Sequence, residues 1–191
     1  MRKLRIFEHI SLDGVIAPTS QGEDTDYAHG GWTAPYRSPD GAALIVEAQG
    51  DGFDLLLGRR TYDLWAGYWP TVKSGPFADN INGATKFVAT HRPDSLTWGP
   101  VADLGPDLAA GVRRVKSQDG PDLIVWGSAS LTPTLLEEGL VDEIVLIVYP
   151  ILLGRGKRCF SDTAHPCDFS LASTKTSSAG VVVNTYRSRN P

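Results

Sequence analysis

Small and basic residues follow three short apolar segments of the chain, and their types suit phosphate. The groups are Gly58-Arg59-Arg60-Thr61-Tyr62, Thr90-His91-Arg92 and Trp126-Gly127-Ser128-Ala129-Ser130-Leu131. Arginine offers a planar fork of donors, and glycine lets the backbone approach a ligand closely. If the apolar segments are parallel strands, the groups meet at one sheet edge, where ligands bind in such folds. Each group also has an ordinary alternative: a glycine turn with solvated arginines, polar residues that end a strand, or Ser130 as a helix cap.

Carboxylates and aromatic residues elsewhere could contact a substrate. Asp13 could orient a substrate or a proton path, but it also begins an Asp-Gly turn, a common structural use. Trp32 and Trp65 could stack on a flat heterocycle or simply fill the core, and the same alternatives hold for Tyr36, Tyr68 and Trp69. The sequence has no evident Ser-His-Asp arrangement and no clustered metal ligands, so we expect no metal site.

Composition excludes several classes of function. The chain has 191 residues with 18 Lys+Arg and 22 Asp+Glu, so its net charge is −4 at pH 7. That balance leaves no overall basic surface for nucleic acid and no polybasic cluster for an anionic membrane. The longest apolar run, Ile144–Leu153, is too short to span a bilayer, and the amino terminus lacks a signal-peptide pattern. Cys159 and Cys167 lack a zinc-binding spacing, and we expect free thiols in a cytoplasmic protein.

Apolar periodicity and turn residues predict the elements that position these groups. The expected strands are 4–12, 53–57, 86–90, 101–104, 123–126, 144–149, 169–176 and 181–187, and the expected helices are 39–49, 59–65, 107–116 and 131–138. Residues 67–83 are expected to be irregular, and 15–34 form a long connection of a kind that is usually functional or mobile. The order predicts one α/β domain over residues 1–191, with a mostly parallel sheet, an antiparallel C-terminal edge and helices on both faces.

Several motifs together resemble a known family. Their order is Ser11-Leu12-Asp13-Gly14-Val15-Ile16-Ala17, then Gly58-Arg59-Arg60-Thr61-Tyr62, then Val125–Leu131, then Leu140-Val141-Asp142-Glu143 with Pro150–Gly156. Over nearly its full length the chain resembles the dihydrofolate reductase-like superfamily. It is most similar to the branch that includes the reductase domain of bacterial riboflavin-biosynthesis deaminase–reductases and its stand-alone relatives.

The resemblance implies NADPH as the cofactor. Gly58 would make the turn at which Arg59, Arg60 and Thr61 hold phosphates at a helix N-terminus. Thr90, His91 and Arg92 would lie near the adenosine 2′-phosphate. The pyrophosphate would lie on the segment Gly127, Ser128, Ala129, Ser130 and Leu131. The backbone of Ile16 and Ala17 would face the nicotinamide amide, and the loop after Ala17 would close over the ring.

The substrate side departs from the family pattern. Ser128 stands where the family often has a second glycine. True dihydrofolate reductases anchor the pteridine with a carboxylate on the first helix; Asp40 lies near that place and Glu47 lies further along, so dihydrofolate itself is not expected.

The resemblance therefore implies an NADPH-dependent reductase of a pteridine- or aminopyrimidine-type heterocycle, similar to 5-amino-6-(5-phosphoribosylamino)uracil reductase of riboflavin biosynthesis. Asp13 or Asp40 would supply the proton, best with a raised pKa. Trp32, Glu47 and Trp65 would contact the substrate. The alternative is a non-catalytic dimeric nucleotide-binding module that retains the fold. A homodimer is expected in either case, because the terminal strands offer an edge for sheet pairing.

Overall fold

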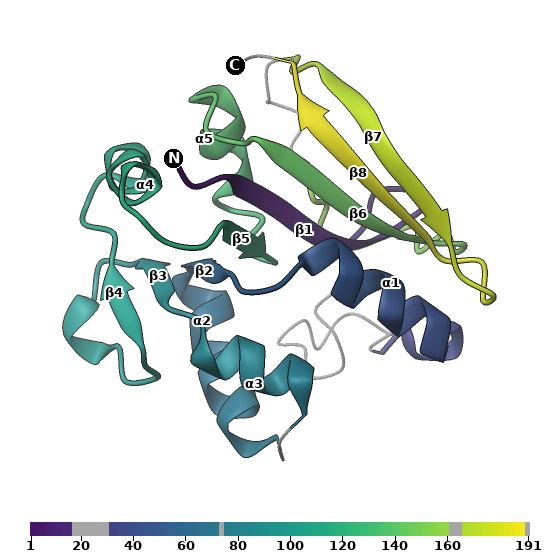
Figure 1. The fold of residues 1–191 in the computed structure, drawn as a ribbon, viewed down its shortest axis with the longest axis horizontal. Coiled ribbons are helices and arrows are strands. Elements are labelled where there is room, and N and C mark those ends of the chain that lie inside the picture. Colours follow the sequence, from purple (N-terminus) through teal and green to yellow (C-terminus); the bar gives the residue numbers. More distant parts are fainter. Residues whose placement is uncertain (17–30, 73–74, 161–165, 190–191) are drawn as a thin grey trace.

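Eight strands form one sheet in the order β4-β3-β2-β5-β1-β6-β8-β7 (Figure 1). The computed structural model describes residues 1–16, 31–72, 75–160 and 166–189. Strands β1 to β6 run parallel, and β8 and β7 add an antiparallel edge, which confirms the expected fold class. The strands are β1 Leu4–Ser11, β2 Asp54–Gly58, β3 Lys86–Ala89, β4 Val101–Asp103, β5 Leu123–Trp126, β6 Glu143–Tyr149, β7 Phe169–Thr176 and β8 Val182–Ser188.

Helices cover both faces of this sheet (Figure 1). On one face lie α1 Pro39–Gln49, α2 Arg59–Tyr68 and α3 Pro76–Gly83, and on the other lie α4 Leu108–Ser117 and α5 Thr132–Glu137. Short 3-10 helices span Ala34–Tyr36, Trp69–Thr71 and Pro93–Ser95. Among the described residues, no helix has the length and apolar character needed to cross a membrane.

Capping side chains explain where two of the helices begin. Ser38 precedes α1, and its Oγ accepts a hydrogen bond from Gly41 N at 3.1 Å. Asp107 precedes α4, and its Oδ1 accepts a hydrogen bond from Ala110 N at 2.9 Å. Each side chain satisfies a backbone N–H that has no partner inside the helix. The starts therefore agree with the sequence prediction to within one residue.

Helix α3 was missed by the sequence prediction, which treated residues 67–83 as irregular. Phe77 and Ile81 are four residues apart, so they share one face of the helix, and both belong to the core on that side of the sheet. Burial of this face outweighs the weak helix propensity of Asn80, Asn82 and Gly83. Packing therefore decides the helix here.

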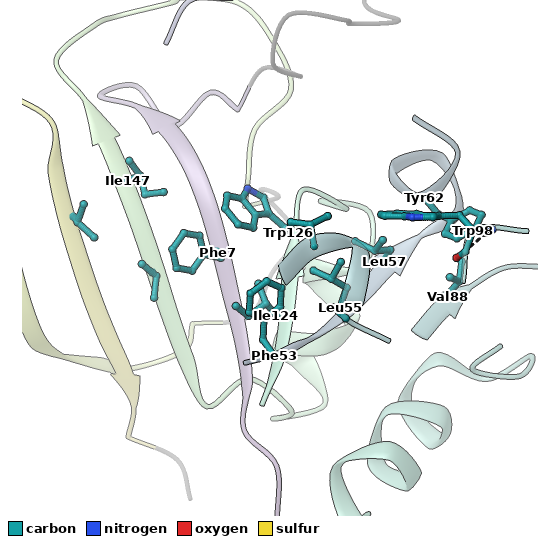
Figure 2. Close-up of a cluster of buried hydrophobic side chains, with 14 of the residues drawn as sticks. Phe7, Phe53, Leu55, Leu57, Tyr62, Val88, Trp98, Ile124, Trp126 and Ile147 are labelled. Atoms are coloured by element: carbon teal, nitrogen blue, oxygen red, sulfur yellow. Dashed lines mark hydrogen bonds between the residues drawn. The ribbon is translucent and has the colours of Figure 1, made fainter. Parts of the chain in front are cut away.

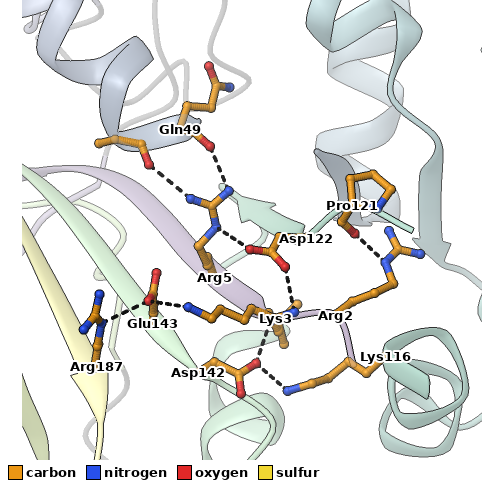
Figure 3. Close-up of polar contacts among 12 residues, drawn as sticks. Arg2, Lys3, Arg5, Gln49, Lys116, Pro121, Asp122, Asp142, Glu143 and Arg187 are labelled. Atoms are coloured by element: carbon orange, nitrogen blue, oxygen red, sulfur yellow. Dashed lines mark hydrogen bonds and ion pairs between the residues drawn. The ribbon is translucent and has the colours of Figure 1, made fainter. Parts of the chain in front are cut away.

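Charged side chains close the edge at which the parallel strands begin (Figure 3). Arg5 of β1 donates from Nη1 to Ala48 O at 3.1 Å and from Nη2 to Gln49 O at 2.7 Å, which attaches the end of α1. Lys3 and Glu143 form an ion pair at 3.1 Å. The same edge holds the ion pairs Lys116–Asp142 and Arg2–Asp54. Because these charged groups neutralise one another, this edge has few charges left to bind a ligand, and the opposite edge is the better candidate for a binding site.

Strand β7 forms one outer edge of the sheet. Most of its residues are exposed, including Leu171. This arrangement is compatible with pairing between two copies, and the homodimer stays a prediction.

Candidate functional site

The structure brings the three phosphate-suited groups to one edge of the sheet. β3, β2 and β5 are neighbours and run parallel. Residues 58–61, 90–92 and 127–131 therefore all follow the carboxyl ends of adjacent strands. This is the edge at which open α/β sheets bind ligands.

Ser128 joins two of these segments. Its Oγ accepts a hydrogen bond from Gly58 N at 3.0 Å, and its own N–H donates to Thr61 Oγ1 at 3.2 Å. The residue has φ 56°, in the left-handed region that favours glycine, and Gly127 before it has φ 62°. Ser128 thus adopts a backbone conformation that favours glycine, and its hydroxyl adds a link to β2 that glycine cannot make.

Arg59 joins the other pair of segments. Its Nε lies 2.8 Å from each carboxylate oxygen of Asp63, and its Nη1 donates to Arg92 O at 3.1 Å and to Ser95 Oγ at 2.5 Å. Thr90 Oγ1 accepts a hydrogen bond from Arg92 N at 3.0 Å, which fixes the turn. The Arg59 guanidinium is therefore a bridge within the protein. The exposed side chains of Arg60, His91 and Arg92 remain on the outside of this edge.

Within the described part of the chain, no strand pairs with the second half of β1 on its β5 side. β1 pairs with β5 only over Leu4–Phe7, whereas its pairing with β6 continues to Ser11. Lys3 O accepts from Leu123 N on the β5 side, and Leu4 O accepts from Asp142 N on the β6 side. Along a parallel strand, the N–H and C=O groups of successive residues point alternately to the two neighbouring strands. Counted from Lys3, the N–H and C=O of His9 therefore point to the β5 side, at a position beyond the end of β5. We call residues 8–10 on this side the open edge of β1, because at Ser11 the N–H already donates to Val15 O and the C=O accepts from Gly14 N.

The side chain of His9 lies in an aromatic cluster on the α1–α3 face. Its ring stacks on Trp126 at a centroid distance of 5.8 Å, and its Nδ1 lies 2.7 Å from Tyr149 Oη. Trp126 also packs against Phe7 at 4.8 Å, as Figure 2 shows. Trp65 of α2 reaches the same Trp126 ring at 5.9 Å. Trp32 meets the Tyr149 ring at 4.9 Å, and its buried Nε1 has no hydrogen-bond partner in the described part of the chain.

The His9–Tyr149 pair is uncharged at neutral pH. Burial, with a contribution from the positive charge of Arg37, lowers the pKa of His9 to about 4. Burial raises the pKa of Tyr149 to about 12. The pair can thus both donate and accept a hydrogen bond without carrying charge.

Glu8 lies on the opposite face of the same strand, since successive side chains alternate. Its side chain is buried, and burial raises its pKa to about 8, although Lys157 and the Gly127 N–H act in the opposite direction. Glu8 Oε1 has no hydrogen-bond partner among the described residues. A neutral carboxyl group therefore lies beside the segment that follows β5.

The two carboxylates predicted to supply a proton are held ionised instead. Asp13 accepts hydrogen bonds from Ser11 Oγ at 2.5 Å and Gly154 N at 2.7 Å, which with Leu153 N lower its pKa to about 2. Asp40 accepts from Ser178 N at 2.6 Å and Ser178 Oγ at 2.8 Å, and the Ser178 N–H is the largest cause that lowers its pKa. Asp13 attaches two loops to each other, and Asp40 attaches the start of α1 to the turn between β7 and β8, so neither carboxylate suits proton donation.

The expected roles of Glu47 at the substrate and of Ile16 at the nicotinamide also need correction. Glu47 pairs with Lys175 and lies next to Ala48 and Gln49, whose carbonyl groups Arg5 binds at the amino-terminal edge, so it is remote from the strand ends. Ile16 N donates to Lys157 O at 2.7 Å, so its N–H is not available to a nicotinamide amide. Ala17 and the loop after it lie outside the described residues.

Sequence reasoning missed Glu8, His9 and Tyr149. Glu8 and His9 gave a usable signal, because two adjacent titratable residues interrupt the apolar residues of a predicted strand. Tyr149 gave none, since a tyrosine at the end of an apolar strand is ordinary.

Comparisons with known proteins agree with this geometry. A family model described as the RibD C-terminal domain matches residues 2–183. YyaP of Bacillus subtilis (strain 168) is 29% identical over 136 residues, which cover 69% of this chain and 72% of that protein. A Shewanella sp. PV-4 protein named for riboflavin biosynthesis superposes with a TM-score of 0.66 at 20% identity, over 98% of this chain and 99% of that one. Dihydrofolate reductase from Enterococcus faecalis, complexed with NADP(H) and RAB-propyl, gives a TM-score of 0.63 at 14% identity, over 98% and 97%.

Proposed function

This chain belongs to the RibD C-terminal domain family, and from that premise we propose that it is an NADPH-dependent reductase of a flat nitrogen heterocycle of the pteridine or aminopyrimidine class. The observation that carries the proposal is the joined edge itself. Arg59 links residues 58–61 to 90–92, Ser128 links residues 58–61 to 127–131, and the open edge of β1 lies alongside.

The residues of this edge suit a dinucleotide. The first turn of α2 has no side-chain cap, so its N–H groups can bind phosphate at the positive end of the helix. Arg92 is exposed at the end of β3 and suits the 2′-phosphate that distinguishes NADPH from NADH. The N–H and C=O of His9 offer one donor and one acceptor, which is the pattern that a carboxamide needs.

The aromatic cluster supports the choice of substrate class. Trp32, Trp65 and Trp126 belong to the cluster that contains His9 and Tyr149, so a planar heterocycle bound at this cluster would contact aromatic rings. The neutral His9–Tyr149 pair would orient such a ring, because an uncharged donor and acceptor can bind its polar edge without a salt bridge. When bound, the reduced nicotinamide supplies the hydride. The chain's own residues would bind, orient and exclude water.

The direct test is titration with NADPH, followed by the fluorescence of the five tryptophans. We expect saturable quenching, because Trp65 and Trp126 lie beside the proposed nicotinamide site. Oxidation of NADPH is then measured with a panel of pteridines and aminopyrimidines. Tyr149→Phe is the variant, and Tyr186→Phe, on β8 opposite the beginning of β6, is the matched control. No quenching at millimolar NADPH would reject the proposal.

The non-catalytic module remains the second candidate, and one observation favours it. Asp13 and Asp40 are both engaged as ionised structural groups. A module of this kind binds NADPH but never oxidises it with any compound of the panel, whereas a reductase turns over with at least one.

A further inference from the structure

Glu8 is a buried carboxyl group whose hydrogen bonding is incomplete. The residue is 4% exposed, and its Oε1 has no partner among the described residues. An unpaired polar atom in the interior costs on the order of 1–3 kcal/mol, so such a group needs an explanation. Thr132 Oγ1, at the start of α5, is a second buried atom without a partner in the described part of the chain. Both residues flank the segment 127–131.

The surroundings of Glu8 are mostly apolar. Ile10, Ile16, Ala129 and Cys159 form a cluster on this face beyond the end of β5. The titratable or charged groups that act on Glu8 are Cys159 and Lys157, both after β6, together with the backbone N–H of Gly127 after β5. β6 contributes the apolar Leu146 opposite Glu8. Burial raises the pKa of Cys159 further, so the thiol stays neutral in the range where Glu8 titrates.

The position of Glu8 matters because Gly127 begins the segment proposed to hold the pyrophosphate. An ionised carboxylate there would repel a phosphate, whereas a protonated one donates a strong O–H hydrogen bond to it. Near neutral pH, Glu8 is in its protonated form.

We propose that the protonated carboxyl group of Glu8 is a hydrogen-bond donor to the pyrophosphate of the bound dinucleotide, so that cofactor binding requires the proton on Glu8. The inference rests on the proposed function. When Glu8 is ionised before binding, one proton is taken from solvent as the complex forms, and no covalent bond changes.

The test is the Kd for NADPH between pH 7 and pH 9.5, a range that lies above the pKa of the 2′-phosphate, about 6. For the wild-type protein we expect a constant Kd up to about pH 8 and then a rise of about tenfold per pH unit. Glu8→Gln keeps a neutral donor of the same shape, so its Kd should stay constant over the whole range. Calorimetry in two buffers of different ionisation enthalpy should record proton uptake above pH 8 for the wild type and none for Glu8→Gln.

Two further variants separate this role from a merely structural one. Lys157→Gln removes the cation that lowers the Glu8 pKa, so the pH at which Kd begins to rise should increase. Cys159→Ser changes the neighbouring titratable group and should leave that pH unchanged. A Kd that is flat for the wild type, or an equal rise in Glu8→Gln, overturns the proposal. Absence of NADPH binding at every pH would instead overturn the proposed function.

Discussion

Glu8 and His9 are neighbours in the sequence but have opposite surroundings and opposite pKa shifts. Strand alternation directs Glu8 to the α4–α5 face and His9 to the aromatic cluster. Burial disfavours the charged form of each, so it raises the pKa of the acid to about 8 and lowers that of the base to about 4. Two titratable residues in one central strand are therefore both neutral at pH 7, although they face different surroundings.

The depressed pKa of His9 predicts a loss of stability in acid. The unfolded chain takes up a proton below about pH 6.5, whereas the folded protein does so only near pH 4. The free energy of unfolding should therefore fall between these values by on the order of 1 kcal/mol per pH unit. His9→Gln should remove this part of the slope in urea denaturation, and His91→Gln, on an exposed loop, is the control. An unchanged slope in His9→Gln contradicts the assignment.

The left-handed backbone of Ser128 predicts which of two substitutions at this position lowers stability more. Ser128→Ala leaves the buried Gly58 N–H without its acceptor and keeps the left-handed backbone, at a cost of about 2 kcal/mol. Ser128→Gly loses the same hydrogen bond but relieves about 1 kcal/mol of backbone strain. The glycine variant should be the more stable of the two in denaturant unfolding. The reverse order would show that the φ of Ser128 carries no strain.

Arg92 predicts the preference between the two nicotinamide dinucleotides. Arg92→Ala should raise the Kd for NADPH by about tenfold, because a charge-assisted contact to the 2′-phosphate is lost, and should leave the Kd for NADH nearly unchanged. Arg113→Ala, which breaks an exposed ion pair with Glu138 on the α4–α5 face, is the matched control. Equal losses for both dinucleotides would remove Arg92 from the 2′-phosphate site.

At the scale of elements, the site is built from loops that rigid strands and helices hold in register. Residues 58–61, 90–92 and 127–131 are far apart in the sequence. They meet because β3, β2 and β5 are neighbours in the sheet. The hydrogen bonds of Arg59 and Ser128 then fix one loop to the next.

The same substitution at two helical glycines should have opposite effects. A Cβ at Gly111 of α4 would lie 2.3 Å from Leu104 O, just after β4. Gly111→Ala must therefore move the helix away from Leu104 and should cost about 3 kcal/mol. Gly67 of α2 has nothing within 4 Å of a built Cβ, so Gly67→Ala should stabilise the protein by up to about 1 kcal/mol. Denaturant unfolding of both variants checks the pair. A tolerated Gly111→Ala would contradict the close approach of α4.

At the scale of the molecule, the two edges of the parallel strands have divided roles. The edge where the strands begin is closed by ion pairs that connect residues far apart in the sequence (Figure 3). The edge where they end carries the exposed basic groups and the open edge of β1. The ion pairs that stabilise the sheet and the residues proposed to bind the cofactor thus lie at opposite ends of the parallel strands.

Removal of Asp54 should show how much the closed edge contributes. Arg2 and Asp54 form a buried ion pair, and Asp54 Oδ1 also accepts from Thr85 N at 2.8 Å. Asp54→Ala leaves the buried Arg2 cation without its carboxylate, with only the Pro121 carbonyl as a hydrogen-bond acceptor among the described residues, and should cost about 3–5 kcal/mol. Glu138→Ala breaks the exposed Arg113–Glu138 pair and should cost less than about 1 kcal/mol. Thermal unfolding of both variants measures the difference, and similar losses would contradict the burial of the first pair.

The sequence by itself determined the strands, most of the helices, the fold class and the three groups of residues at the strand ends. Those features are local, because apolar periodicity, capping residues and glycine turns act over a few neighbouring positions. Tertiary structure alone decided which groups are already occupied: Asp13, Asp40 and Arg59 bind their own protein, and α3 forms because its apolar face is covered. It also decided the protonation of Glu8 and His9, since burial depends on contacts between distant segments that no local pattern records.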